Sequence, residues 1–253
     1  MSQLPESPII TIERRKAVTV IVAAVILAIA LGGGLTKVGS GFAARSANGI
    51  TVTGSAKVAA VADNAVWTLS VALSAPKVAD AVTRVGAGVD SLTKYLSDGG
   101  IPAEALTLGP VSTYANEEYL NGNSTGRILS YRASRDVTIR STDVQLISKL
   151  SQGIGSLLQS GVPVNNYGPQ YYVSTLADLR PQLLGEAMQD AKVRAEALTK
   201  AVGGSVGAVM SVKSGPFQVT TPDSTMTSDM GAYDTSSINK TITSTVSVTF
   251  KTN

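Results

Sequence analysis

The side chains available for chemistry in this sequence are hydroxyls, amines and carboxylates, because the chain contains no cysteine and no histidine. Their absence excludes cysteine nucleophiles, disulfides, zinc sites built from Cys and His, and acid–base catalysis by histidine. The redox compartment stays open, since a protein without cysteine is stable in both reducing and oxidising surroundings.

Two Ser-x-x-Lys tetrads have the spacing found in acyl enzymes that pair serine with lysine. They run from Ser74 to Lys77 and from Ser91 to Lys94, and neither is followed by a Ser-Asp-Asn or Lys-Thr-Gly partner motif. Because matches over four residues arise often by chance, a solvated helix start and a solvated helix face explain them better. We expect a serine-directed covalent probe to label neither serine, and we predict that the protein is not an enzyme.

The carboxylates indicate no catalytic or metal-binding geometry. Glu117 and Glu118 are adjacent in a predicted strand, so their side chains point to opposite faces and cannot converge on one substrate. Asp223, Asp229 and Asp234 fall in a polar segment but lack the dense ligand spacing of a calcium-binding loop. We therefore predict no catalytic residues, no metal site and no cofactor.

The sequence indicates neither a nucleotide nor a nucleic acid as a partner. Gly86-x-Gly88 lacks the third glycine of a dinucleotide-binding turn and follows no predicted strand. The net charge is only +3, and outside the N-terminus no cluster of lysine and arginine is interleaved with aromatic residues. The mildly basic composition is that of an ordinary solvated surface.

Tyrosine is the residue type that most suggests recognition. We expect about half of six tyrosines to pack in the core or across a hairpin, whereas an exposed cluster would suit a protein interface. The six are Tyr114, Tyr119, Tyr131, Tyr167, Tyr171 and Tyr172.

Residues 17–35 form the clearest targeting feature, because they carry no charge and a single hydroxyl. As a helix they span about 28 Å, close to the ~30 Å of a bilayer's hydrocarbon core. Arg14, Arg15 and Lys16 precede them, so the positive-inside rule places the N-terminus in the cytoplasm. The prediction is a cytoplasmic tail at 1–16, a transmembrane helix at 17–35, a linker at 36–48 and an extracytoplasmic domain at 49–253.

A cleaved signal peptide is the alternative to this membrane anchor. Gly32-Gly33-Gly34 could end a shorter apolar core, and Phe42-Ala43-Ala44 is an imperfect small-residue cleavage site. The length of the apolar stretch favours the anchor and a location in a bacterial cytoplasmic membrane; cleavage would instead give a secreted protein.

From residue 49 the chain alternates predicted hairpins and helices, which indicates an α+β fold of antiparallel hairpins packed with three main helices. The helix at 77–96 is expected to bury Val78, Val82, Val85, Val89, Leu92 and Leu96, and the helix at 142–160 Leu146, Ile147, Leu150, Ile154, Leu157 and Leu158. The predicted strands are 50–54 with 65–73 as one hairpin, 106–119 with 127–140 as a second, a Tyr-rich strand at 165–175, and 207–219 with 238–250 as a last hairpin.

The stretch at 181–215 is predicted to be a long amphipathic helix, a double-glycine stop and a short buried strand at 206–212. Gly203 and Gly204 end the helix, because glycine adopts the left-handed cap conformation without strain. The segment 216–237 is a polar loop too long for a tight turn, and a register step near Ser244 predicts a bulge in the last strand. The helix is expected to bury Leu184, Met188, Ala191, Ala195, Leu198 and Val202.

Three segments in this order resemble the SIMPL-domain family of bacterial periplasmic and surface immunogenic proteins. They are the opening strand Ile50-Thr-Val-Thr-Gly-Ser-Ala, the Ala-repeating helix that ends at Gly203-Gly204-Ser-Val-Gly207, and the closing strand Val246-Ser-Val-Thr-Phe250. The resemblance covers residues 49–251 and departs from the family at Val206, where leucine is usual, and in the polar loop. It implies an α+β domain with no known catalytic centre and, for some members, self-assembly into rings or channels.

These features favour a membrane-anchored, non-enzymatic envelope protein that forms a homo-oligomer and meets the lipid bilayer through residues 17–35. The alternative is a monomeric envelope module that binds a ligand or a partner protein through the Tyr-rich segment or the polar loop. A well-formed apolar pocket would favour that alternative.

Overall fold

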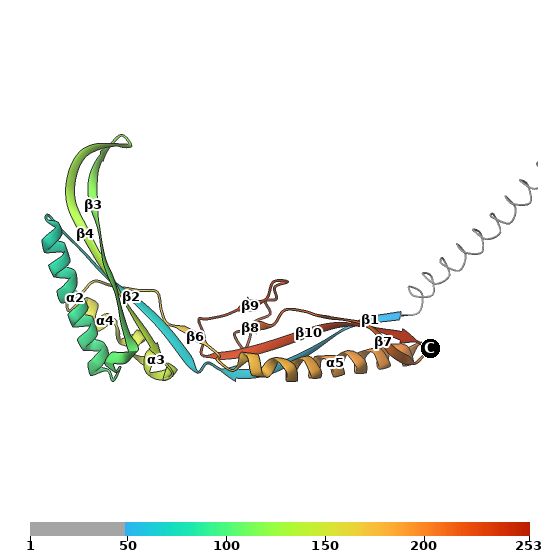
Figure 1. Cartoon of the computed structure of the whole chain (residues 1–253). Helices are drawn as coiled ribbons and strands as arrows, with labels where there is room; N and C mark the ends of the chain where they lie inside the picture. Colours follow the sequence, from blue (N-terminus) through green and yellow to red (C-terminus); the bar gives the residue numbers. More distant parts are fainter. Residues whose placement is uncertain (1–48) are drawn as a thin grey trace, which may run out of the picture. The chain divides into compact units, whose positions relative to one another are not determined.

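A computed structural model describes residues 49–253, which fold as an α+β structure with two β-sheets (Figure 1). The predicted tail, transmembrane helix and linker at 1–16, 17–35 and 36–48 lie outside these residues. Between residues 49 and 253 no helix combines the length and apolarity needed to cross a membrane. The described chain divides into a larger unit, residues 54–190 and 214–246, and a smaller one, residues 49–53, 191–213 and 247–253.

One sheet lies wholly in the larger unit and has the strand order β3-β4-β2-β5, with β6 also paired to β2. Strand β2 pairs antiparallel with β4, β5 and β6, and β3 pairs antiparallel with β4. The strands are β2 (Asn64–Ala75), β3 (Leu106–Leu120), β4 (Asn123–Ser141), β5 (Val164–Asn166) and β6 (Gln170–Tyr172).

Helices cover one face of this sheet and enclose the main hydrophobic core. Trp67, Leu69 and Val71 of β2 alternate with polar residues and are fully buried, as expected of a strand covered on one face. The helices are α2 (Val78–Asp98), α3 (Val144–Gly153) and α4 (Gly155–Gln159), and a short 3₁₀ turn η1 (Ala103–Ala105) follows α2.

Helix α2 confirms most of the core face predicted for 77–96. Val85, Val89, Leu92 and Leu96 are buried, but the prediction is wrong for Val78, which is 43% exposed. Near the start of the helix it is Ala81 that is buried instead.

Two glycines of α2 give a matched test of how closely this helix packs on β2. A Cβ on Gly88 would lie 2.8 Å from Val71 Cγ1, whereas a Cβ on Gly86 would meet no atom within 4 Å. We expect Gly88→Ala to lower the free energy of unfolding by about 1–3 kcal/mol through overpacking. Gly86→Ala should raise it by about 0.5–1 kcal/mol, because alanine favours the helix.

Urea unfolding midpoints of the two glycine variants check this expectation. Equal midpoints would contradict the close approach of α2 to β2, because both substitutions add the same methyl group to the same helix.

The second predicted hairpin is confirmed, and its turn explains why. Asn121 and Gly122 have φ angles of 51° and 83°, the left-handed pair that a two-residue hairpin turn requires. Strand β3 then pairs with β4 from Leu120↔Asn123 to Leu106↔Ile139, with three register shifts on the way.

The first predicted hairpin is wrong, because β1 (Gly49–Val61) and β2 belong to different sheets. Between the two strands the backbone N–H of Ala62 donates to Ile238 O at 2.8 Å, and that of Asp63 donates to Tyr172 O at 3.0 Å. The Asp63 carboxylate accepts from the Ser174 N–H and hydroxyl at 2.8 and 2.6 Å. Residues 62 and 63 therefore bind distant parts of the chain and do not form the tight turn of a hairpin between β1 and β2.

The second sheet has the order β1-β10-β8-β9, with β7 also paired to β10. The last predicted hairpin is therefore confirmed. Besides β1, the strands of this sheet are β7 (Val206–Ser214), β8 (Gln218–Thr220), β9 (Ala232–Tyr233) and β10 (Asn239–Thr252). The segment 216–237 is more structured than the predicted loop, because β8 and β9 within it pair in parallel.

Strand β10 shows one uninterrupted alternation of buried and half-exposed residues. Lys240, Ile242, Ser244 and Val246 share its buried face, so the bulge predicted at Ser244 is wrong. The apolar pattern is interrupted in the sequence because two inward positions are polar, Lys240 and Ser244. The strand itself keeps its alternation there.

Helix α5 (Leu176–Ala201) runs along strands of this second sheet (Figure 1). It starts five residues before the predicted position, so that Pro181 lies inside it. The predicted buried stripe is wrong at several positions. Leu198 and Val202, which the sequence predicts to be buried, are 53% and 84% exposed. The positions that are buried recur every fourth residue, at Leu183, Ala187, Ala191, Ala195 and Thr199.

Three further predictions differ from the structure. Strand β7 is exposed along most of its length, not buried, because it pairs with β10 on one edge only in the described sheet. The helix predicted at 142–160 is divided into α3 and α4, with Leu158 51% exposed. The strand predicted at 165–175 is two short strands, β5 and β6, joined by a turn at Gly168 with φ 83°.

Candidate functional site

The serines and lysines of the two tetrads are not brought together as nucleophile and base. Ser91 Oγ donates to Ala87 O at 2.9 Å, and Lys94 Nζ pairs with the Asp98 carboxylate at 2.9 Å. Ser74 and Lys77 are both exposed where β2 passes into α2. The Ser91 hydroxyl and the Lys94 amine therefore bind other groups of helix α2 and not each other.

The acidic residues are also separated by their contacts. Glu117 accepts from Ser124 Oγ at 2.6 Å, while Glu118 accepts from Thr125 Oγ1 at 3.0 Å and pairs with Arg127 at 3.5 Å. Within residues 49–253 no three carboxylates converge as a metal ion would require.

The six tyrosines divide as the sequence predicts. Tyr171 is buried, Tyr131 and Tyr172 are half-buried, and Tyr172 packs near Tyr233 with ring centroids 6.0 Å apart. The exposed members are Tyr114, Tyr119 and Tyr167.

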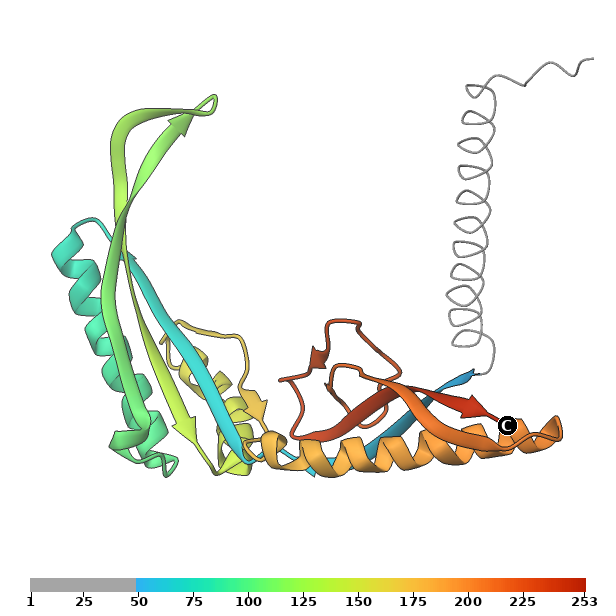
Figure 2. The same ribbon diagram turned by 45° about the vertical axis from the view of Figure 1, so that its right-hand side comes forward.

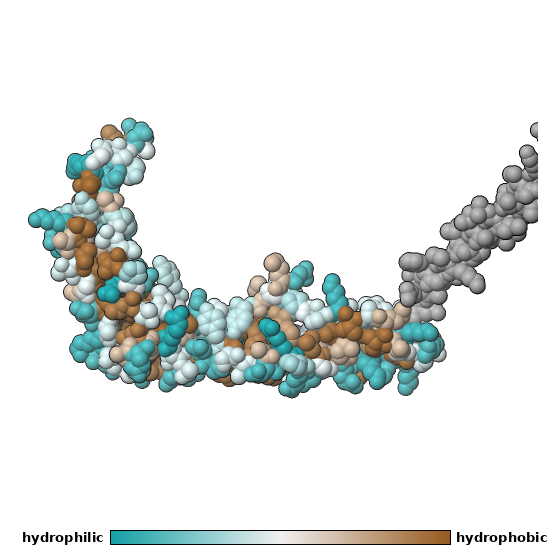
Figure 3. All heavy atoms as spheres, viewed as in Figure 1, coloured by the Kyte–Doolittle hydropathy of each residue, from teal (hydrophilic) through white to brown (hydrophobic). Residues whose placement is uncertain are grey.

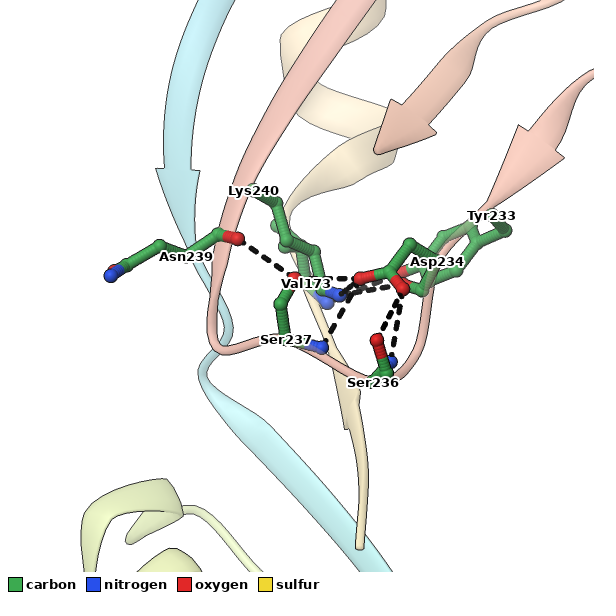
Figure 4. Close-up of polar contacts among 7 residues, drawn as sticks. All are labelled: Val173, Tyr233, Asp234, Ser236, Ser237, Asn239 and Lys240. Atoms are coloured by element: carbon green, nitrogen blue, oxygen red, sulfur yellow. Dashed lines mark hydrogen bonds and ion pairs between the residues drawn. The ribbon is translucent and has the colours of Figure 1, made fainter. Parts of the chain in front are cut away.

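A polar network holds the turn from residue 234 to residue 240, termed here the 234–240 turn (Figure 4). Lys240 Nζ, in a side chain with 0% exposure, lies 3.1 Å from Asp234 Oδ2 and donates to Asp234 O at 2.5 Å. The hydroxyls of Ser236 and Ser237 donate to the same carboxylate at 2.7 and 2.6 Å. The buried ammonium is therefore neutralised inside the turn, and the serine side chains are fixed.

Two carboxylates, those of Asp234 and Asp63, have pKa values below the ordinary range. Partial burial raises the pKa of Asp234, but hydrogen bonds from Ser237, Ser236 and Lys240 outweigh burial and hold that pKa well below its usual value. Hydrogen bonds from the Ser174 hydroxyl and N–H lower the pKa of Asp63. The charged form of both groups is the one that the fold stabilises.

These two carboxylates should therefore make stability depend on pH at the acid end. Because the folded-state pKa values of Asp234 and Asp63 are depressed, their contribution is complete above the unfolded-state value of about 3.9 and is lost as pH falls below it. The chain has no histidine, so we expect a flat urea midpoint between about pH 6 and 8. Urea midpoints measured across pH check this, and a midpoint that rises on acidification from pH 5 to 3 would contradict it.

One wall of an open pocket of about 590 Å³ is formed by the 234–240 turn. The other walls are α3 and the segment 167–171, and Pro222 adds to the lining. We call it the serine pocket, because hydroxyl and amide side chains provide most of its polar groups: Ser148, Ser151, Gln152, Ser236, Ser237 and Asn239. Apolar surface also lines it, from Tyr167, Pro169, Tyr171, Pro222 and Ile238.

A second feature is the far part of hairpin β3–β4, residues 116–130, which we call the ribbon. Strand β2 pairs with β4 only from Tyr131 onward, so no third strand of the described chain supports the ribbon. Figure 2 shows the two strands continuing beyond β2 and α2. Its exposed apolar side chains are Tyr119, Leu120, Ile128 and Leu129.

These side chains give the ribbon a mixed surface, in which hydrophobic residues stand among hydrophilic ones (Figure 3). Leu120 is 67% exposed and Leu129 52%. An isolated two-stranded hairpin is marginally stable in water, so a neighbour that buried these apolar side chains would stabilise the ribbon.

Sequence reasoning missed the buried lysine and the turn around it. The available signal was the period of β10, because Lys240 is two residues before Ile242 and therefore shares its inward face. It also missed Asn166, whose Oδ1 accepts from Trp67 Nε1 at 2.8 Å and from Gly168 N at 2.9 Å.

A comparison with known families agrees with the fold. A family model described as SIMPL, a protein of unknown function (DUF541), matches residues 50–250. No curated protein matches the sequence.

Proposed function

The chain belongs to the SIMPL family, and from that membership we propose that it is a non-enzymatic, membrane-anchored protein of the cell envelope whose extracytoplasmic domains self-assemble into a ring- or channel-like homo-oligomer. The anchor is the apolar stretch 17–35, with Arg14, Arg15 and Lys16 on its cytoplasmic side. Residues 49–253 are then the part that assembles outside the membrane.

The observation that carries this proposal is the unsupported ribbon. A projection of two strands that exposes leucine, isoleucine and tyrosine gains stability when a neighbour buries those side chains. Identical copies supply identical ribbons, and anchoring in one membrane holds the copies in a common orientation, which favours closed rings. The long outer edge of β3, 15 residues, offers backbone groups for the same contact.

The absence of cysteine makes a crosslinking experiment direct. Leu120→Cys places the only thiol of the chain on the ribbon, and mild oxidation of membranes should give a disulfide-linked dimer. Leu158→Cys is the matched control, because Leu158 is 51% exposed on α4, outside the ribbon.

Equal crosslinking at the two positions would mean random collision and would contradict an interface at the ribbon. An interface that packs Leu120 of one copy against Leu120 of the next brings the two thiols within disulfide distance, so no crosslink at Leu120→Cys would contradict that pairing of the ribbons.

A further inference from the structure

We infer that the serine pocket binds an uncharged saccharide, a property that goes beyond self-assembly and does not depend on it. The pocket lies within the larger unit. Its volume of about 590 Å³ falls in the range of about 300–1,000 Å³ typical of small-molecule sites. The question is which ligand its lining fits.

The lining residues are uncharged, which excludes an ion as the preferred ligand. The charged pair of the 234–240 turn, Asp234 and Lys240, is satisfied internally, because Lys240 has 0% exposure and donates to Asp234. A charged ligand entering the pocket would lose its hydration without meeting a counter-charge, which costs free energy. The ligand is therefore neutral.

Three serine hydroxyls of the pocket, those of Ser151, Ser236 and Ser237, donate their protons within the protein and are left as acceptors. Ser236 and Ser237 donate their protons to the Asp234 carboxylate, and Ser151 donates to Ser148 O at 2.8 Å. A hydroxyl that has given its proton to the protein still offers lone pairs. These three hydroxyls accept hydrogen bonds from a ligand that carries many hydroxyls, and they offer no donor to a phosphate or a carboxylate.

An aromatic side chain completes the match to a sugar. Tyr167 is 87% exposed beside these polar groups, and tyrosine combines an apolar ring face with a polar tip. The ring can cover the C–H face of a sugar while the serines accept from its hydroxyls. Asn239 and Gln152 add amides that both donate and accept.

Two of the pocket's walls, the segment that carries Tyr167 and the 234–240 turn, are fixed before a ligand arrives. Asn166 Oδ1 accepts from the buried Trp67 indole at 2.8 Å and from Gly168 N at 2.9 Å, which holds the turn that carries Tyr167. The opposite wall is held by Asp234. Groups held in place in the free protein lose less conformational entropy on binding.

Titration of the full chain in a polyoxyethylene detergent tests the inference, because maltoside detergents would compete for the site. The probes are N,N′-diacetylchitobiose, cellobiose, glucuronic acid and a decaproline peptide, followed by ligand-observed NMR. We expect at least one neutral disaccharide to bind, and to bind more tightly than glucuronic acid.

Two variants locate the binding. Tyr167→Ala should weaken disaccharide binding by about tenfold or more, and Tyr167→Phe should retain most of it because the ring remains. Tyr114→Ala, which removes an exposed tyrosine of β3 outside the pocket, should bind as the unaltered chain does.

Three results would overturn the inference. They are no binding of either disaccharide, unchanged binding by Tyr167→Ala, or binding of decaproline without the sugars, which would make the pocket a peptide site. Far-UV circular dichroism of each variant shows that the fold is retained.

Discussion

Replacing Asp234 with asparagine should lower the free energy of unfolding by about 3 kcal/mol, because the buried Lys240 ammonium then has no counter-charge. Lys240 has 0% side-chain exposure and lies 3.1 Å from the carboxylate. Its bond to Asp234 O survives the substitution, which keeps the loss at the lower end for a broken buried ion pair. The measurement is urea unfolding near neutral pH, where the carboxylate is ionised in the unaltered chain.

A second substitution separates the charge from the shape of the turn. Lys240→Met removes the buried charge and leaves Asp234, 22% exposed, with its serine partners, so we expect a loss of only about 1 kcal/mol. The double variant should be more stable than Asp234→Asn alone. If the effects of the two changes simply add, the ion pair contributes nothing and the account of the turn is wrong.

Making the ribbon polar should convert the assembled protein into single chains. In Leu120→Ser with Leu129→Ser, each change removes an apolar side chain whose burial against a neighbour contributes about 2 kcal/mol. The fold should keep its stability, because both leucines are more than half exposed. Sedimentation velocity in detergent would show the loss of the larger species.

The matched control for the ribbon is Leu158→Ser with Leu198→Ser. These leucines are 51% and 53% exposed, so the change in composition is the same and both control positions are, like the ribbon leucines, more than half exposed. The control should sediment as the unaltered chain does. Dissociation of the control, or assembly of the ribbon variant, would place the contact elsewhere.

Local signals predicted the elements whose structure depends on neighbours in sequence. The spacing of Val85, Val89 and Leu92 predicted the buried face of α2, and the alternating segments 106–119 and 127–140 predicted the second hairpin, which turns at Asn121-Gly122. Both follow from backbone geometry within a few residues.

The first hairpin could not be predicted, because pairing is decided far along the chain. Residues 62 and 63 look like a turn between two alternating strands, yet their N–H groups bind Ile238 and Tyr172. A sequence pattern shows that a strand has one buried face and does not show which strand lies beside it.

Helix α5 shows a second limit. Apolar or small residues occupy neighbouring positions, such as Leu183 with Leu184 and Ala187 with Met188, so the period fits two faces of the helix. The structure buries the face with the smaller residues, which allows a close approach to the sheet, and leaves Val202 exposed.

The candidate sites were only partly visible in the sequence. Tyr119 and Tyr167 were identified as candidates for recognition, and both are exposed. The serine pocket was not foreseen, because it joins residues of α3, the 167–171 segment and the 234–240 turn, which are separated by tens of residues.

The mass of the full chain in detergent, measured by light scattering coupled to size exclusion, tests self-assembly most directly. After subtraction of the detergent, we predict a protein mass that is an integral multiple of one chain. The mass of a single chain at every loading concentration would contradict the proposed assembly.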